Sequence, residues 1–432
     1  MIYSNLSVTT EGHLSIAGVD AMALLREYGS PLYVLDEDLL RANMRLYLRA
    51  MKTSFGENSM PLLASKALCF KQIYRIAKDE GIGTDLVSVG EIHTAASVGF
   101  PMENTCFHGN NKTDCDLNYA LDARVGCIVV DNTDELLALE RLAAERGITQ
   151  KILLRITPGI DPHTFAAVTT GKVDSKFGSA IQTGAAREIT RIALAQPHLR
   201  LAGFHCHIGS QVFDASVYLR TSDIMLRFIL DMRNEFDFTA AELNLGGGFG
   251  VRYTDSDPSL DIEGSIRLIA HHMKSQCAQL DLPLPRVLME PGRSIVAEAG
   301  ITLYTVGSVK RIPGFRNYVS VDGGMTDNPR FALYRSSYTV LPVGKMTEPR
   351  TMSASVVGRC CESGDILQEN VCLPESIARG DALAVLTTGA YNFSMASNYN
   401  RVPRLPVAMV RQGSHYLAVR RETPDDVARL DI

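Results

Sequence analysis

The chain has 432 residues, of which 46% are hydrophobic and 21% are charged, and its formal net charge is −5. This composition excludes disordered, collagen-like and disulfide-scaffold proteins. A slightly acidic chain gives no electrostatic reason to expect nucleic acid as a partner, so a small-molecule partner is favoured. Because single hydrophobic cores stop growing at roughly 250–300 residues, the length predicts two domains.

The nine cysteines are spread along the chain without paired spacing, and several lie in apolar runs such as residues 126–130. This distribution is typical of a reduced, cytoplasmic protein. The amino-terminal sequence MIYSNLSVTT has no basic region followed by an apolar stretch, and no segment approaches the roughly 18 continuous apolar residues of a spanning helix. We therefore expect a cytoplasmic protein without membrane contact.

Short apolar runs alternate with longer segments of helical period between about residue 60 and residue 293, which is the pattern of parallel β-α units. Eight runs are predicted strands: 62–64, 84–87, 105–108, 127–130, 152–156, 201–205, 243–245 and 287–289. After the fourth run, Asn132 and Thr133 can cap a helix and Gly147 can end it. Eight strands with intervening helices predict a (β/α)8 barrel.

The helical period fades beyond about residue 300, where Gly, Pro and Asp turns separate apolar or alternating runs. The predicted strands here are 301–309, 318–321, 338–343, 354–357, 382–386, 407–410 and 416–419. Many short strands with turn residues between them indicate an all-β second domain.

Polar residues and glycines follow the predicted barrel strands, at the end where this fold builds its active sites. Lys66 follows the first strand, Gly246, Gly247 and Gly248 follow the seventh, and Glu290 follows the eighth. Glycines let backbone N–H groups approach phosphate oxygens closely. A lysine that faces a phosphate site suggests pyridoxal phosphate, whose pyridine nitrogen a carboxylate such as Glu290 would keep protonated.

Each of these features alone has a plainer explanation. A glycine run is more often a turn or a close packing point, and a lysine is most often a solvated surface charge. His205 and His207 would share a strand face and suggest zinc, but no third ligand accompanies them at metal spacing, so we expect no metal. Cys360 and Cys361 are more often packing residues than reactive ones.

In combination the motifs resemble the fold-type III pyridoxal-phosphate decarboxylases, which pair an alanine-racemase-like barrel with a β domain. The resemblance runs nearly end to end, through PLYVLDE (31–37), ASKAL (64–68), TGKVDSKFG (170–178), HIGSQ (207–211), LGGGFG (245–250), EPGR (290–293), DGGMTDNPRFALY (322–334), CESGD (361–365) and GAYNFSMASNYN (389–400). We expect a barrel domain over residues 36–298 and a β domain that joins residues 1–35 to 299–432.

The resemblance assigns chemical roles to residues of both predicted domains. Lys66 would form the Schiff base with the cofactor, His207 would stack on its ring and Glu290 would pair with its pyridine nitrogen. The other positions implied in cofactor binding are Asp85, Glu91, Ser210, Gly246, Gly247, Gly248, Gly292, Arg293 and Tyr391. The positions implied in binding the distal end of the substrate are Arg293, Arg330, Tyr334, Glu362 and Tyr391.

Cys361 matches the thiol that returns a proton to the substrate carbanion, so the implied catalytic residues are Lys66, His207 and Cys361. In this family the segment that corresponds to 361–365 enters the site from a partner subunit, which implies a homodimer with shared active sites. Two positions depart from the family pattern, because Arg359 stands where proline is usual and Asn392 where glycine is usual. Three of the implied site residues have structural roles that are as well supported as the functional ones. Asp85 could cap the following helix, Glu91 could stabilise its first turn, and Tyr334 could be a packed aromatic of the β domain.

Within this resemblance, Glu290 favours decarboxylation over racemisation, because alanine racemases of this fold place an arginine at the ring nitrogen. The motifs at 170–178 and 393–400 are similar to the branch of the family that converts meso-diaminopimelate into L-lysine and CO2, the last step of lysine synthesis. One alternative is a sibling decarboxylase for ornithine, arginine, carboxynorspermidine or a carrier-bound amino acid, although a diamine substrate would favour an acid over Arg330. Another is an inactive homologue kept as a binding protein, which should have lost Lys66 or Cys361.

Overall fold

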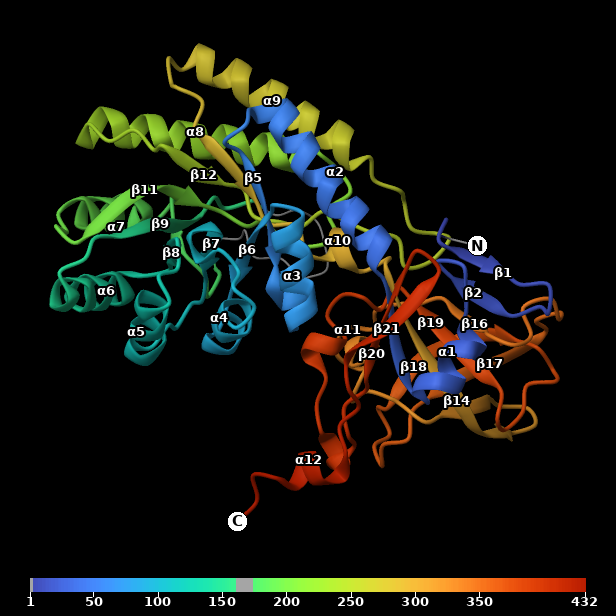
Figure 1. Ribbon diagram of the computed structural model, residues 1–432. Coiled ribbons are helices and arrows are strands. Elements are labelled where there is room, and N and C mark those ends of the chain that lie inside the picture. Colours follow the sequence, from blue (N-terminus) through green and yellow to red (C-terminus); the bar gives the residue numbers. More distant parts are fainter. Residues whose placement is uncertain (1–2, 161–173) are drawn as a thin grey trace. The chain divides into compact units, whose positions relative to one another are not determined.

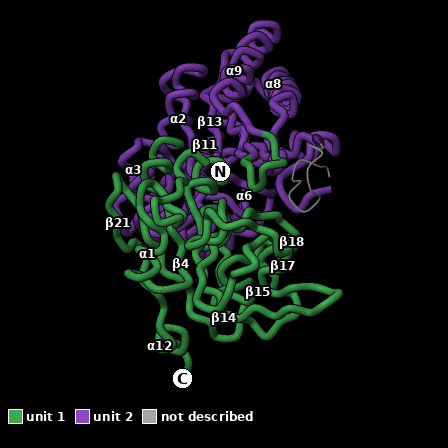
Figure 2. Tube along the Cα trace, turned by 90° about the vertical axis from the view of Figure 1, so that its right-hand side faces the viewer, with its two compact units in different colours: residues 1–43, 251–258, 293–432 green, residues 44–250, 259–292 purple. Residues whose placement is uncertain are grey.

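A computed structural model describes residues 3–160 and 174–432 of the chain. The chain forms two compact units, which Figure 2 colours separately. The barrel unit comprises Met44–Gly250 and Ser259–Gly292, and the β unit comprises Met1–Asn43, Val251–Pro258 and Arg293–Ile432. The predicted domain boundaries at residues 36 and 298 stay a prediction.

The barrel unit is built on eight parallel strands that close into a cylinder. They are β5 (Met60–Ala64), β6 (Gly83–Leu86), β7 (Thr105–Phe107), β8 (Cys127–Val130), β9 (Gln150–Thr157), β11 (Leu199–His205), β12 (Glu242–Asn244) and β13 (Arg286–Met289). The strands pair in chain order, and the pairing of β13 with β5 closes the cylinder. The short strand β10 (Ser179–Ala180) pairs with the end of β9. The predicted (β/α)8 barrel is confirmed.

Helices follow the barrel strands and lie outside them (Figure 1). They are α3 (Lys71–Asp79), α4 (Val89–Ala96), α5 (Asp114–Asp122), α6 (Thr133–Arg146), α7 (Ala185–Leu194), α8 (Ser216–Phe236) and α9 (Ile262–Gln279), with the one-turn helices η1 (Ser65–Ala67) and η2 (Met102–Asn104). The predicted ends of α6 are confirmed, because the Asn132 side chain accepts the Glu135 N–H and Gly147 ends the helix with a φ of 61°.

Apolar side chains from six barrel strands pack together in the interior of the cylinder. This cluster consists of Leu62, Cys106, Cys127, Val129, Leu153, Ala202 and Leu288. The interior of the barrel is therefore a packed core.

The β unit is centred on a sheet in the order β18-β17-β15-β14-β4-β20-β21, with β19 pairing β14 and β16. Its strands are β4 (Leu32–Asp36), β14 (Gly300–Arg311), β15 (Asn317–Val321), β16 (Val340–Pro342), β17 (Met352–Val357), β18 (Ile366–Leu373), β19 (Ala382–Leu386), β20 (Val407–Arg411) and β21 (Ser414–Val419). Strand β4 lies between β14 and β20, so the expected inclusion of the N-terminal segment in the β fold is confirmed. Strand β18 was not predicted, because Gln368, Glu369 and Asn370 interrupt its apolar pattern.

Smaller elements complete the β unit. They are the strands β1 (Leu6–Val8), β2 (Leu14–Ile16) and β3 (Val19–Asp20), the helices α1 (Ala21–Tyr28), α10 (Arg293–Val296), α11 (Arg330–Tyr334) and α12 (Pro424–Ala428), and the turns η4 (Phe393–Met395) and η5 (Tyr399–Arg401). Helix α2 (Glu37–Phe55) begins in the β unit and continues into the barrel unit.

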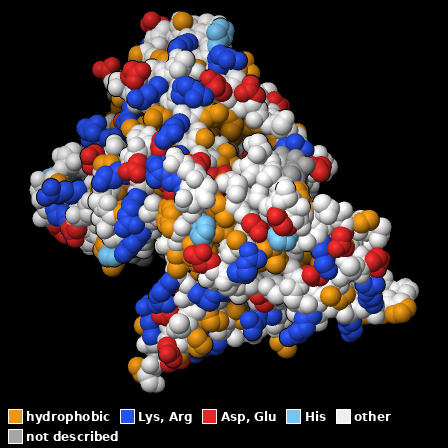
Figure 3. All heavy atoms as spheres, turned by 45° about the vertical axis from the view of Figure 1, so that its right-hand side comes forward, with side chains coloured by type: hydrophobic (Ala, Val, Ile, Leu, Met, Phe, Trp, Pro, Cys, Tyr) orange, Lys and Arg blue, Asp and Glu red, His pale blue; other side chains and the backbone are white. Residues whose placement is uncertain are grey.

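Charged side chains of both signs are interspersed on the face that Figure 3 shows. This mixed pattern agrees with the small net charge of −5. Within the described ranges, no helix combines the length and the apolar character that crossing a membrane would require.

Candidate active site

The barrel unit contains a pocket of about 310 Å³ at the carboxyl ends of its strands. It is lined by Lys66, Val87, His108, Gly109, Asn110, Arg155, Phe177, His205, His207 and Glu290. The volume lies within the range of about 300–1,000 Å³ that is usual for small-molecule sites. The structure thus brings together Lys66, His207 and Glu290, which the sequence analysis had placed in one site.

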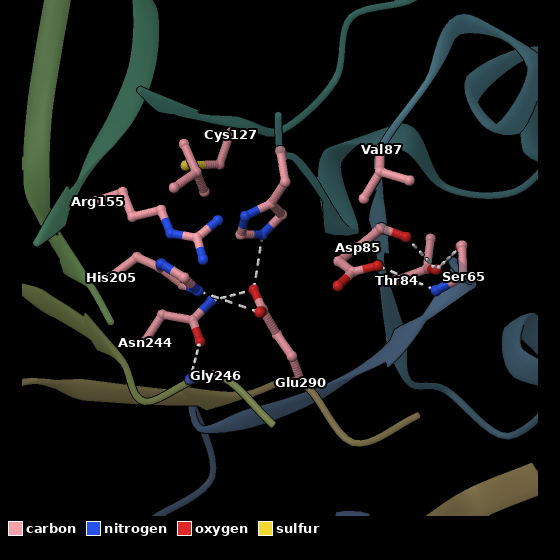
Figure 4. Close-up of polar contacts among 12 residues, drawn as sticks. Ser65, Thr84, Asp85, Val87, Cys127, Arg155, His205, Asn244, Gly246 and Glu290 are labelled. Carbon is pink, nitrogen blue, oxygen red and sulfur yellow. Dashed lines mark hydrogen bonds and ion pairs between the residues drawn. The ribbon is translucent and has the colours of Figure 1, made fainter. Parts of the chain in front are cut away.

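Lys66 lies in the turn η1, directly after β5, and the neighbouring strand β6 fixes this turn. The Ser65 N–H donates to Asp85 Oδ1 at 3.0 Å, and the Ser65 hydroxyl lies 2.8 Å from Thr84 Oγ1. Tyr74 donates its hydroxyl to Ser65 Oγ at 2.9 Å. Figure 4 shows Ser65, Thr84 and Asp85 in this arrangement. These bonds hold the backbone that carries Lys66, so the amine projects from a fixed point of the barrel rim.

Asp85, which is buried, and Glu91, which is half-buried, are acids on the Lys66 side of the pocket. Burial raises the pKa of Asp85 to about 6, an effect that Lys66 opposes and Glu290 strengthens. Burial and the charge of Asp85 raise the pKa of Glu91 to about 7. Asp85 supports the Lys66 turn and does not cap α4, whose N-cap is Ser88. Glu91 accepts the Val87 N–H at 2.8 Å and so supports the start of α4. This agrees with its alternative role as an acid of the first helical turn.

Replacing Asp85 with asparagine should change how stability depends on pH. The folded pKa of about 6 lies above the ordinary value of 3.8, so the native wild type binds more protons than the unfolded chain between about pH 4 and 6. Its free energy of unfolding should therefore fall relative to Asp85→Asn as the pH rises through this window, by at most about 3 kcal/mol. Urea unfolding of both full chains without added cofactor measures the gap. A gap that stays constant from about pH 4 to 7 would contradict the assignment.

Glu290 follows β13 and receives three side-chain hydrogen bonds, two of which Figure 4 shows with labelled donors. His108 Nε2 and Asn244 Nδ2 each donate to Oε1 at 2.7 Å, and His205 Nε2 donates to Oε2 at 3.2 Å. Burial opposes the charged form, yet electrostatic attraction to the His108 and His205 rings, together with the hydrogen bonds from them, holds the pKa of Glu290 well below its ordinary value. The pocket therefore contains a buried carboxylate that stays anionic at neutral pH.

His108, His205 and Glu290 also meet the geometric minimum for a metal site, because one ligand atom of each lies within 4.8 Å of the others. Sequence spacing could not reveal this group, since its members come from three different strand ends. Zinc at Nε2 of His205 would move the ring proton to Nδ1, which is buried and has no hydrogen-bond partner among the described residues. Histidines that bind metals almost always donate their second N–H to an acceptor. The geometry therefore favours a hydrogen-bonded cluster over a metal centre.

His207 and Ser210 follow β11 and are half-buried. Burial and the nearby positive charge of Lys66 lower the pKa of His207 well below its ordinary value, so its ring is neutral where it lines the pocket. A neutral imidazole suits contact with another aromatic ring. Of the motif at 170–178, residues 170–173 lie outside the described residues, while Phe177 lines the pocket.

The glycine run after β12 lies at a point where strand ends approach closely. A Cβ on Gly246 would lie 2.8 Å from His207 Nδ1, one on Gly247 would lie 2.1 Å from the Glu290 carbonyl oxygen, and one on Gly248 would lie 2.5 Å from the Gly209 carbonyl oxygen. Gly292 is equally crowded, since a Cβ there would lie 2.7 Å from Ala64 Cβ. The close-packing explanation is therefore correct for these glycines, and their role in holding a phosphate stays a prediction.

Alanine at position 247 should therefore destabilise the protein and displace the Glu290 backbone. We expect Gly247→Ala to lower the free energy of unfolding by about 2–3 kcal/mol, as overpacking does, and to weaken cofactor binding. Gly90→Ala is the matched control, because a Cβ on this helical glycine meets its nearest atom at 3.7 Å. Thermal unfolding and cofactor titration of both variants measure the difference. Equal stability of the two variants would show that position 247 is not crowded.

The β unit contains a second set of candidate residues, centred on Tyr391. The guanidinium groups of Arg293 and Arg330 lie 4.8 and 5.4 Å from the centre of the Tyr391 ring, and both arginines are buried. Arg293 also donates to the hydroxyl of Tyr253 at 2.5 Å. Two buried cations beside one tyrosine form a donor set that suits a carboxylate. Tyr253 is not among the predicted site residues, although it closely follows the glycine run.

The remaining candidates of the β unit are more exposed. Tyr334 is 41% exposed and its ring centre lies 5.3 Å from the Arg330 guanidinium, so it is not a fully packed aromatic. Cys361 and Glu362 are exposed, and the Cys361 N–H donates to Asn400 Oδ1 at 3.0 Å. The buried Asp365 accepts the N–H groups of Met325 and Cys360 at 2.6 and 2.7 Å, which folds this segment into a turn.

The two departures from the family pattern are accommodated by the backbone. Asn392 has a φ of −104°, which does not require glycine, and its side chain donates to the Thr388 carbonyl at 3.1 Å. The positive φ lies one residue earlier, at Tyr391, with a value of 61°. The Arg359 N–H donates to the Gly323 carbonyl at 2.9 Å, a bond that proline could not make.

Comparisons with known proteins agree with the residues in the pocket. The family described as pyridoxal-dependent decarboxylase, pyridoxal binding domain, matches residues 41–297. The diaminopimelate decarboxylase of Bacillus subtilis is 44% identical over 421 residues, which cover 98% of this chain and 95% of the relative. The chain belongs to the diaminopimelate decarboxylase family. The family member from Staphylococcus aureus is 40% identical, over 95% of this chain and 96% of the relative.

A solved structure in the diaminopimelate decarboxylase family has the same architecture. The enzyme from M. jannaschii, in co-complex with L-lysine, matches with a TM-score of 0.90 and 30% identity, over 99% of this chain and 98% of that chain. The expected family and fold are thus confirmed, and the chain is a pyridoxal-phosphate-dependent decarboxylase. The pocket fits this cofactor, because it offers an amine on Lys66, an anionic carboxylate on Glu290 and a neutral ring on His207.

Proposed function

We propose that this protein decarboxylates meso-2,6-diaminopimelate to L-lysine and CO2, as the final step of lysine synthesis. The observation that carries the proposal is the pocket in which the Lys66 amine and the anionic Glu290 line the same cavity. The named relatives, which match over nearly the whole chain, support the choice of substrate. When bound, pyridoxal phosphate withdraws electrons from the substrate Cα, so that the bond to the carboxylate can break and CO2 can leave.

The residues of the barrel unit hold and polarise the cofactor in this proposal. Lys66 binds its aldehyde through Nζ, and Glu290 keeps a proton on its ring nitrogen. His207 contacts the ring, while Ser210 and the turns at 246–248 and 292 hold the phosphate. Asp85 and Glu91 support the Lys66 side of the pocket. Cys361 donates the thiol proton that Cα needs once CO2 has left.

The residues of the β unit bind the distal end of the substrate. Arg293 and Arg330 bind the distal carboxylate, which is supported by the burial of both guanidinium groups beside Tyr391. Tyr391 and Tyr334 supply hydroxyl groups, and Glu362 pairs with the distal ammonium group. An acid in place of Arg330 would instead suit a diamine, so the residue at this position favours diaminopimelate over ornithine.

We also propose a homodimer in which the segment 361–365 of one copy completes the active site of the other. The exposure of Cys361 and Glu362 supports this arrangement. Co-expression of Lys66→Ala with Cys361→Ala tests it, because mixed dimers would contain one intact site and restore about a quarter of the wild-type activity. Each variant alone is the control and should be inactive. No activity in the mixture would show that Lys66 and Cys361 act within one copy.

We also propose that the enzyme is located in the cytoplasm. Its nine cysteines are all free, which supports a reducing compartment. Fractionation of cells that produce the protein, followed by activity measurement, tests the location.

The substrate is tested by CO2 release from the purified protein with added cofactor. We expect kcat/KM for meso-diaminopimelate to exceed that for ornithine, arginine and carboxynorspermidine by at least about 100-fold. Arg330→Lys should raise KM for meso-diaminopimelate about tenfold with a smaller effect on kcat, because lysine cannot bind a carboxylate with two parallel bonds. Preference for any of the other three substrates would overturn the proposal.

A further inference from the structure

We propose that His108, His205 and Asn244 form a cluster of hydrogen-bond donors that fixes Glu290, as an anion, in position to pair with the ring nitrogen of the cofactor. This inference rests on the role of Glu290 in the proposed function. His108 and His205, which line the pocket, and Asn244, which bonds Glu290, thereby gain a positioning role that their sequence context does not indicate.

The number of hydrogen bonds at Glu290 supports the donor cluster. A carboxylate offers about four lone-pair positions to hydrogen-bond donors. Donors among the described residues use three, at 2.7 Å by His108, at 2.7 Å by Asn244 and at 3.2 Å by His205. The count leaves one position, which the proton on the cofactor ring can use. Glu290 is thus held in one orientation before any ligand binds.

The direction of two of the donors, Asn244 and His205, is fixed by their surroundings. Asn244 Oδ1 accepts the Gly246 N–H at 2.9 Å, so its amide nitrogen must face Glu290. His205 Nδ1 is buried without a partner among the described residues, so a charged ring would bury an N–H that has no acceptor. His205 is therefore neutral and donates through Nε2. Burial, which lowers its pKa to about 4, agrees with this state.

The neutral donors Asn244 and His205 have a chemical advantage over cations at this site. An arginine or lysine bonded to Glu290 would cancel its charge and weaken its hold on the ring-nitrogen proton, whereas an N–H of a neutral side chain stabilises the anion and leaves its charge in place. Arg155 lines the same pocket, but its Nε lies 4.0 Å from Asp131 Oδ1 and its guanidinium lies over the Phe177 ring at 4.3 Å. Arg155 is therefore paired with another acid.

Other ionisable groups also face Glu290, and their charges influence the pH at which it is protonated. They are Lys66 on η1, Asp85 on β6, Cys106 on β7, Arg155 on β9, and Cys206 and His207 after β11. None of these groups changes in the variants that test the cluster.

The experiment measures the protonation of Glu290 in the holoenzyme by infrared spectroscopy. The band of its carboxyl group is assigned by comparison with Glu290→Gln. Wild-type Glu290 should stay ionised from about pH 5 to 8. His205→Leu and His108→Leu remove one donor each and should move the protonation midpoint upward by at least about one pH unit. His205→Gln keeps an N–H near the position of Nε2 and should restore most of the wild-type midpoint.

The second readout is cofactor retention after dilution of the holoenzyme at about pH 6. The leucine variants should bind pyridoxal phosphate at least about tenfold more weakly than wild type, and His205→Gln should recover most of this loss. If a leucine variant fails to fold, Asn244→Asp replaces it, because this substitution is nearly isosteric. A second carboxylate beside Glu290 should also raise the protonation midpoint of Glu290. His272→Leu is the matched control, since it removes a 2.7 Å bond from His272 Nε2 to Asp223, outside the pocket.

A midpoint that stays at the wild-type value in every folded variant would overturn the donor cluster. A full chain that binds no pyridoxal phosphate would instead overturn the proposed function. The two failures are distinguishable, because the infrared titration reports on Glu290 with or without the cofactor.

Discussion

Replacing Lys66 with alanine is expected to reduce CO2 release at least about 1,000-fold, the scale of loss that follows removal of a residue covalently engaged in catalysis. Lys66 lies on a turn that is fixed by hydrogen bonds among Ser65, Thr84 and Asp85. Among the described residues that line the pocket, it is the only lysine. The protein should also lose the visible absorption of the bound cofactor on dialysis.

Lys71→Ala is the control for this prediction, because Lys71 is exposed at the start of α3, five positions further along the chain. It should retain wild-type activity. A Lys66→Ala protein that keeps more than about a tenth of the activity, or that keeps its yellow colour through borohydride treatment and dialysis, would contradict the role of Lys66.

Glu290→Gln is expected to lower kcat about 100- to 1,000-fold, the loss typical of removing one preorganised electrostatic contact. The amide is neutral, so it cannot stabilise a proton on the cofactor ring. Its NH2 group would also face donors, since His108 and Asn244 point at one oxygen and His205 at the other. Single-turnover CO2 release at saturating cofactor measures the effect on the chemical step.

Glu140→Gln is the control for the Glu290 variant, because Glu140 bonds only His198 among its described partners, on the outside of the barrel. It should leave turnover unchanged. Glu290→Asp should lie between wild type and Glu290→Gln, since it keeps the charge at a greater distance. Turnover of Glu290→Gln within about threefold of wild type would show that the charge at position 290 is not needed.

Local patterns in the sequence were sufficient to predict the eight strands of the barrel. Runs such as 127–130 are apolar, short and bounded by turn residues, and the α6 caps at Asn132 and Gly147 follow from residue type alone. Strand β18 was missed because its polar residues Gln368 and Glu369 break the apolar pattern, and its pairing with β17 decides its conformation.

The members of the site were predictable only in part. Lys66, His207 and Glu290 carry recognisable motifs, and the structure places them in one pocket. His108 and Asn244 carry no such signal, since they reach Glu290 across 182 and 46 positions of the chain through closure of the barrel. Glycine is usual in the family at the position of Asn392, yet the positive φ occurs at Tyr391, because backbone angles depend on the surrounding fold.

Peptide mapping of the borohydride-reduced holoenzyme tests the central claim most directly. Reduction makes the link between the cofactor and its lysine permanent, so mass spectrometry of the digested protein identifies the modified residue. We predict a single pyridoxyl phosphate group on the peptide that contains Lys66, and none after prior exchange with a saturating amine substrate. A label on another lysine, or reduced protein without label, would contradict the account.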